Sequence, residues 1–267
     1  MPVFERLSVV VSITLIGLAL YFVLDFPAQV AEVSLLGSPL QLESPQQWLM
    51  MVLLGGLALA GTDAIIRAQP ALRGRNVAYV ATFWPLPTLL VLLATQTLGL
   101  AVSPVIWAAS LVGAGILLWG TISAETHLIP SPGHGPLWAR VWQQFVGYAI
   151  VLTFAIIIYH TRVRSAVSAT SMILVGGGAS LALLRQPPDS VFRTWLFALV
   201  IGLSLGQITW ALNYWRTGAL NAGLLLFFAF YVLVGLAYQH LQNTLSRRAL
   251  WEYGAISAAA AVVIFLL

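Results

Sequence analysis

The stretch ALNAGLLLFFAFYVLVGLAYQH, residues 219–240, contains no Asp, Glu, Lys or Arg from one end to the other. A helix rises about 1.5 Å per residue and the hydrocarbon core of a bilayer is about 30 Å thick, so about 20 apolar residues cross it. This stretch therefore predicts one membrane-spanning helix. The rest of the chain repeats the same pattern.

Similar apolar runs follow one another along the whole chain. They are continuous rather than alternating, which excludes a transmembrane β-barrel. The fold class that we predict is all-α: a polytopic integral membrane helical bundle of about nine transmembrane helices. Eight helices are the alternative, because the last run is short. The runs are 7–26, 47–66, 77–97, 103–122, 141–160, 165–184, 193–213, 219–240 and 250–267.

Charged residues are scarce: they make up 7% of the 267 residues, whereas 60% of the residues are hydrophobic. An average soluble domain has about 25% charged residues, so this composition excludes a soluble enzyme and a disordered chain. All 12 basic residues are arginines, and there is no cysteine. The chain therefore has no thiolate, no Cys-ligated metal and no lysine for a Schiff base, and we predict no cofactor.

The arginines lie at the ends of the apolar runs, which argues against nucleic acid as a partner despite the net charge of +4. If the N-terminus is cytoplasmic, nine arginines fall inside and three outside, a positive-inside bias. The first outer loop, roughly 27–46, has none. We expect a multi-pass protein of the cell membrane, the plasma membrane of a prokaryote. The inner arginines are Arg6, Arg67, Arg73, Arg75, Arg140, Arg185, Arg193, Arg247 and Arg248, and the outer ones are Arg162, Arg164 and Arg216.

Two inner loops are alike. The second run ends in Ile66-Arg67-Ala68-Gln69-Pro70, and the sixth ends in Leu184-Arg185-Gln186-Pro187-Pro188. Aligning them pairs the first four runs with the next four in the same orientation, which is a parallel repeat. The alternative is that arginine and proline are ordinary residues where a helix leaves a membrane. If the repeat is present, the single transmembrane domain 1–267 comprises halves 1–125 and 139–248 and a final helix 250–267.

Prolines and glycines indicate where the helices break or pack closely. Trp84-Pro85-Leu86-Pro87 interrupts the third run, so we expect a kink or a locally broken hydrogen-bond ladder there. The spacing Gly202-x-x-x-Gly206 predicts close helix packing, and Gly176-Gly177-Gly178 predicts a tight contact or a flexible break.

Asp63 is the first ionisable residue inside a run, and such residues are candidate sites because they are costly in a membrane. Arg67 follows four residues later, so both side chains share one helix face and can pair. The pair is either a proton or cation site for transport or a structural ion pair at the interface.

A second group of candidates is expected at the inner surface. Glu125, His127 and His134 fall in a Pro- and Gly-rich segment that we predict to be a loop, and His240 ends the eighth run on the same side. Together with Asp63 they could perform acid–base chemistry on a lipid, and His127, His134 and His240 are candidate metal ligands. Their spacing matches no ligand motif on a single helix, so solvated loop histidines are the alternative.

A polar and aromatic stripe follows the seventh run at helical spacing. It could line a cavity for a small polar ligand, or it could form hydrogen bonds between helices. Its members are Ser204, Gln207, Trp210 and Tyr214.

Three classes of function are consistent with these features. Small-solute or ion transport is slightly favoured, on the repeat, the broken third run and Asp63. An accessory or scaffold subunit of a membrane complex is the second class. The expected partners are the lipid bilayer and either other membrane subunits or further copies of the chain. The third is an intramembrane enzyme that acts on a lipid or isoprenoid at the cytoplasmic interface, with Asp63, Glu125, His127 and His240 as catalytic candidates.

Overall fold

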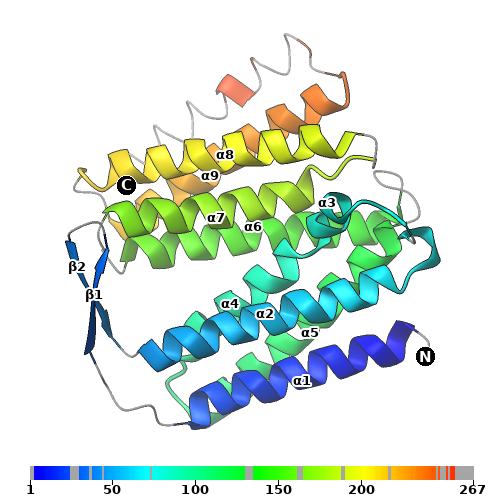
Figure 1. Cartoon of the computed structure of the whole chain (residues 1–267). Coiled ribbons are helices and arrows are strands. Elements are labelled where there is room, and N and C mark those ends of the chain that lie inside the picture. Colours follow the sequence, from blue (N-terminus) through cyan, green and yellow to red (C-terminus); the bar gives the residue numbers. More distant parts are fainter. Residues whose placement is uncertain are drawn as a thin grey trace.

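The computed structural model is a bundle of long helices that lie side by side (Figure 1). Eight of the described helices are long and apolar enough to cross a membrane. This confirms the predicted helical membrane bundle. The described residues are 3–24, 30–35, 38–43, 45–72, 74–129, 135–160, 165–187, 190–215, 218–244, 246, 251 and 253–255.

The helix boundaries follow the apolar runs closely. Most of the predicted ninth run, 250–267, lies outside the described residues. The helices are α1 (Val3–Val23), α2 (Pro45–Arg67), α3 (Val77–Val80), α4 (Pro85–Leu98), α5 (Pro104–Leu128), α6 (Leu137–His160), α7 (Ser165–Leu183), α8 (Val191–Leu212) and α9 (Ala219–Leu241).

The third span is broken where the prolines predict it. It begins with α3, passes through the 3-10 turn η2 (Ala81–Phe83), and continues as α4 from Pro85. Asn76 starts the span, because its side chain accepts a hydrogen bond from the Ala78 amide at 3.0 Å. Proline lacks an amide hydrogen, so the helical ladder cannot run unbroken through residues 81–87.

The contacts between helices divide the eight spans into two groups of four, which lie side by side (Figure 1). In the first half, α1 contacts α2, α2 contacts α4, α4 contacts α5, and α5 returns to α1. In the second half, α6 contacts α7, α7 contacts α8, α8 contacts α9, and α9 returns to α6. The halves meet where α4 and α5 pack against α6 and α7. A parallel duplication would produce this arrangement, and the duplication itself stays a prediction.

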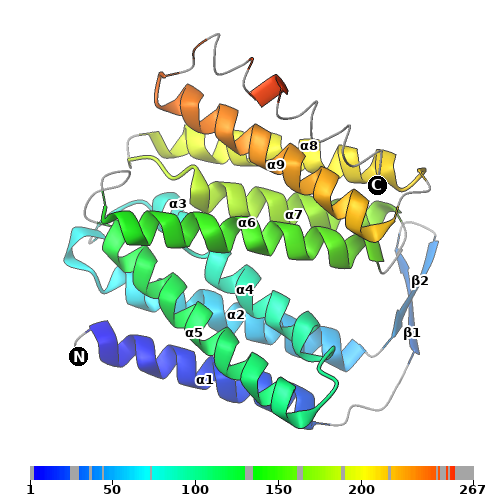
Figure 2. The ribbon, with the colours of Figure 1, turned by 180° about the vertical axis from the view of Figure 1, so that it is seen from behind.

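Within the described residues, the two ends of the bundle differ in their arginine content. All the arginines in the described part of the chain, Arg6, Arg67, Arg75, Arg140, Arg185 and Arg193, lie at the end where α2, α5, α7 and α9 terminate (Figure 2). We call this the arginine end. A two-stranded antiparallel hairpin, β1 (Val30–Leu35) and β2 (Ser38–Glu43), lies at the opposite end, in the segment predicted only as a loop. The cytoplasmic location of the arginine end stays a prediction.

Glycines bring α7 and α8 into close contact, as their spacing predicts. A Cβ on Gly202 would lie 2.8 Å from the backbone oxygen of Ile173 and 3.1 Å from the Cα of Gly177. A side chain at this crossing would therefore have to displace backbone, and the helices approach so closely because both residues lack one.

Candidate functional site

Asp63 and Arg67 pair in the last turns of α2, as their spacing predicts. The Arg67 Nε donates to both carboxylate oxygens of Asp63 at 2.8 Å. The Trp84 indole donates to the same carboxylate at 3.1 Å. The side chains remain partly open, with 26% of Asp63 and 42% of Arg67 exposed. Asp63 thus has two bonded neighbours, one of which comes from the proline break.

Glu125 lies in a helix and not in the predicted loop. The helix α5 continues to Leu128, so Glu125 sits near its end, with 1% of its side chain exposed. A carboxylate this deeply buried requires a partner. The partner is Arg185, whose Nη1 donates to Oε2 at 2.5 Å, although the two residues are 60 positions apart. The prediction of a loop was wrong because this ion pair allows a charged residue to remain helical.

Arg185 fastens the second half of the bundle to the first. It follows α7, yet its Nε donates to the Thr82 hydroxyl at 3.0 Å and its Nη2 donates to the Thr82 carbonyl at 2.8 Å. Its guanidinium carbon also lies 3.6 Å from the centroid of the Phe83 ring, a cation–π contact. We call the set Arg185, Glu125, Thr82 and Phe83 the staple.

The break in the third span explains why Arg185 binds there. Thr82 and Phe83 form the 3-10 turn η2, and Pro85 and Pro87 follow directly. Backbone carbonyls at such a break lose helical donors and need others, because the hydrocarbon core offers no water. The Thr82 carbonyl receives its donor from Arg185. The break therefore creates an acceptor that a residue of the other half satisfies.

The candidate histidines that the structure describes do not contact the Glu125–Arg185 ion pair. His127 lies in α5, where its Nδ1 is 2.8 Å from the Ser123 carbonyl oxygen and its ring packs on Trp138. His240 packs against Phe197 instead. No three His, Cys, Asp or Glu side chains in the described ranges come close enough to share a metal ion. His134 lies outside the described residues.

The stripe on α8 faces outward rather than into a cavity. Gln207, Trp210 and Tyr214 are exposed on the bundle surface, and Ser204 is half-buried. The Trp210 indole donates to the Tyr214 hydroxyl at 3.3 Å, so both side chains meet beyond the helix surface. Amphipathic aromatic residues at the end of a span are typical of the membrane–water interface.

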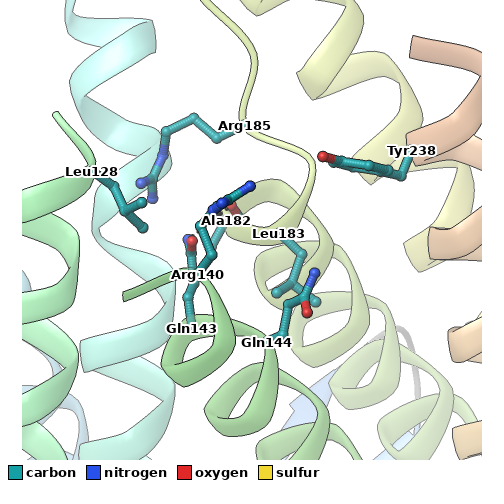
Figure 3. A pocket seen from close by; sticks show the side chains of 8 residues that line it. All are labelled: Leu128, Arg140, Gln143, Gln144, Ala182, Leu183, Arg185 and Tyr238. Atoms are coloured by element: carbon teal, nitrogen blue, oxygen red, sulfur yellow. Dashed lines mark hydrogen bonds between the residues drawn. The ribbon is translucent and has the colours of Figure 1, made fainter. Parts of the chain in front are cut away.

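A small basic cavity of about 60 Å³ opens at the arginine end, mainly between α6, α7 and α9 (Figure 3). Figure 3 shows Arg140 between Arg185 on one side and Tyr238 on the other. Among the described residues that line it, none carries a carboxylate. Its lining is Leu128, Arg140, Gln143, Gln144, Ala182, Leu183, Arg185 and Tyr238. We call it the basic cavity.

A second cavity, of about 200 Å³, lies at the same end in the first half. We call it the histidine cavity, and it is lined by Phe4, Leu7, Gln69, Ser123, Thr126 and His127. A third, of about 160 Å³, lies near the opposite end and is lined by Tyr21, Gln47, Trp48, Met51 and Gln96. The basic cavity is the one of the three with arginines in its lining.

The sequence alone does not reveal that Arg185 belongs to the site, because an arginine at the end of an apolar run is also typical of those that orient a membrane chain. A usable signal was present nonetheless. Arg185 and Glu125 each follow an apolar run, on the same predicted side, and the proline break lies on that side too. Charges of opposite sign placed at one depth are candidates to pair.

Comparison with known proteins gives one family. No curated protein and no solved structure matches the chain. A family model described as "Protein of unknown function (DUF5656)" matches residues 26–267. The match includes every described span except α1 and contains all residues of the staple and of the basic cavity. The chain is a multi-pass helical membrane protein that belongs to the DUF5656 family.

Proposed function

We propose that this protein binds the phosphate-bearing headgroup of a membrane lipid in the basic cavity, without catalysing a reaction on it. The observation that supports the proposal is the lining of that cavity. Arg140, Arg185 and Tyr238 line one opening, and two glutamines, Gln143 and Gln144, complete it.

The chemistry of the lining suits an anionic phosphate. Guanidinium groups present several N–H donors in a planar fork that matches phosphate oxygens. Glutamine amides and the tyrosine hydroxyl add neutral donors. Arg185 also belongs to the staple, so Arg140 is the lining arginine that can be changed without breaking the staple.

The depth of the cavity is also appropriate. It lies where α5 and α7 end and α6 begins, which is where the polar headgroup region of a bilayer meets a spanning helix. Basic pockets between spanning helices on the cytoplasmic side typically hold anionic lipid headgroups. The predicted cytoplasmic location of the arginine end would place the cavity in the leaflet that is rich in such lipids.

Transport was the function that the sequence slightly favoured, and the structure adds no observation for it. It would need a polar cavity between the halves that reaches Asp63 or Gln207. None of the three cavities described above is lined by either residue. We therefore do not extend the proposal to transport. An accessory subunit of a membrane complex remains the alternative, and lipid binding is compatible with it.

The test is lipid binding by the purified full-length protein. Native mass spectrometry from detergent would count bound phosphatidylglycerol and phosphatidylcholine for the parent chain and for Arg140→Gln. We expect the parent to retain phosphatidylglycerol preferentially. A hydrogen bond to a charged group contributes about 1.5–3 kcal/mol, so Arg140→Gln should weaken that binding about tenfold to a hundredfold.

Arg193→Gln is the matched control. Arg193 lies at the start of α8 at the same end, is exposed, and lines none of the three cavities. The Arg193→Gln substitution removes one positive charge from the same end of the bundle as Arg140→Gln does. Equal loss in both variants would show general attraction to the arginine end and would overturn the proposal, as would equal retention of both lipids by the parent chain.

A further inference from the structure

The histidine cavity has a different chemistry from the basic cavity. Its described lining has no charged side chain: it combines the apolar Phe4 and Leu7 with the polar Gln69, Ser123 and Thr126, and with His127. It is also larger than the basic cavity, at about 200 Å³ against about 60 Å³. An anionic headgroup would find no arginine in this lining.

Hydrogen bonds within the last turns of α5 leave acceptors at the cavity. The Ser123 carbonyl oxygen is 2.8 Å from the Nδ1 of His127, and a carbonyl can only accept. In the neutral ring the proton therefore sits on Nδ1, and Nε2 is an acceptor. The Thr126 hydroxyl donates to the same carbonyl at 2.7 Å, so its oxygen retains lone pairs for another donor.

The two cavities occupy corresponding positions in their halves. The histidine cavity is lined by α1, the segment after α2, and the end of α5. The basic cavity is lined by α6, the end of α7 with the segment after it, and α9, together with Leu128. Moreover, α5 ends in His127-Leu128 and α9 ends in His240-Leu241. His127 lines the histidine cavity, whereas His240 lines neither of these two cavities.

We propose that the histidine cavity binds the hydroxyl end of an uncharged membrane alcohol, a molecule with one free hydroxyl on a long apolar body. The hydroxyl donates to Nε2 of His127 or to the Thr126 oxygen, and the apolar body lies along Phe4 and Leu7. Diacylglycerols and long-chain isoprenoid alcohols both have this chemistry. The site is separate from the basic cavity and does not depend on phosphate binding there.

The experiment measures binding to the full-length protein in phosphatidylcholine nanodiscs. Native mass spectrometry would compare dioleoylglycerol, the same molecule with its hydroxyl acetylated, and a long-chain isoprenoid alcohol. We expect the free alcohols to bind and the acetylated molecule to bind about tenfold more weakly. The alcohol that binds more tightly identifies which of the two sources the site takes.

Two variants locate the site. His127→Phe retains a ring to pack on Trp138 but removes the acceptor, and Thr126→Val removes the hydroxyl with little change in shape. Each should weaken alcohol binding about fivefold to tenfold. His240→Phe is the matched control at the corresponding position and should leave binding unchanged.

The outcomes are separable. Equal binding of dioleoylglycerol and its acetylated form would overturn the proposal, because the hydroxyl would not be recognised. Loss of binding in His240→Phe equal to that in His127→Phe would also overturn it. Arg140→Gln tests the basic cavity alone, so failure of the phosphate proposal leaves this result interpretable.

Discussion

Two arginines lie at the ends of α2 and α7, one in each half of the bundle, and their side chains bind in different ways. Arg67 ends α2 and binds Asp63, four residues earlier on the same helix, where both side chains are partly exposed. Arg185 follows α7 and crosses to Glu125 and Thr82 in the other half, where both members of the ion pair are buried. The Asp63–Arg67 pair lies within one turn of a single helix, whereas the Glu125–Arg185 pair links the two halves.

The energies expected for the two pairs differ accordingly. Exposed helical pairs four residues apart contribute about 0.3–0.5 kcal/mol. Breaking a buried pair by removing one partner is destabilising by about 3–5 kcal/mol, because the other charge remains buried without compensation. Substitutions at these ion pairs and at the contacts near them measure the difference.

Arg185→Met should have the largest effect. It leaves the Glu125 carboxylate and the Thr82 carbonyl buried without their donor, so the free energy of unfolding should fall by about 3–5 kcal/mol. Unfolding in mixed detergent micelles, followed by circular dichroism, measures the change.

Glu125→Leu combined with Arg185→Met is the control for this interpretation. Without the buried carboxylate the uncompensated charge is gone, so the double variant should regain much of the stability lost by Arg185→Met. A double variant that is no more stable than Arg185→Met would show that Arg185 acts mainly through Thr82 and Phe83.

Gly202→Ala should have the next largest effect. The new methyl would lie 2.8 Å from the Ile173 backbone oxygen, and overpacking of this kind is destabilising by about 1–3 kcal/mol. Gly113→Ala in α5 is the matched control, because nothing lies within 4 Å of a Cβ built there. Its stability should be unchanged or slightly raised. Equal losses in both variants would contradict the close crossing of α7 and α8.

Trp84→Phe tests the link between the proline break and Asp63. The variant retains an aromatic ring but loses the indole donor, which is 3.1 Å from the carboxylate. We expect a loss of about 1–2 kcal/mol in the free energy of unfolding. Adding Asp63→Asn should reduce the further effect of Trp84→Phe, and strictly additive losses would show that the two groups do not interact.

Arg67→Met should have the smallest effect, below about 1 kcal/mol, because its partner is partly exposed and retains the Trp84 donor. The same micelle unfolding assay measures it beside Arg185→Met. If Arg67→Met and Arg185→Met lowered the free energy of unfolding equally, the two ion pairs would not differ in their contribution to stability.

Much of the fold is readable from the sequence, because the thickness of the bilayer sets the length of each run. The broken third span and the close α7–α8 crossing also follow from local signals, proline and glycine. Contacts four residues apart are equally local, which is why the Asp63–Arg67 pair could be predicted. The end of α5 could not be predicted in this way, because Glu125 there is stabilised by Arg185, which lies 60 positions away in the sequence.

The orientation of the α8 stripe shows the second limit. Helical spacing shows that Gln207, Trp210 and Tyr214 lie near one another, but it does not tell which way that face turns. In a soluble protein the apolar face turns inward, whereas in a membrane lipid tails are as apolar as the core. Polarity alone therefore could not decide between a cavity and the outer surface, and the structure shows these side chains exposed.

The staple also has a consequence for the order in which the protein is made. Glu125 and the Thr82 carbonyl leave the ribosome before Arg185, which follows Glu125 by 60 residues. At a synthesis rate of about 5–20 residues per second, the first half waits roughly 3–12 s for its partner. During that interval the unpaired groups must be held by the insertion machinery, by water or by lipid headgroups. The arrival of Arg185 then joins the first half to α6 and α7, before α8 and α9 have been made.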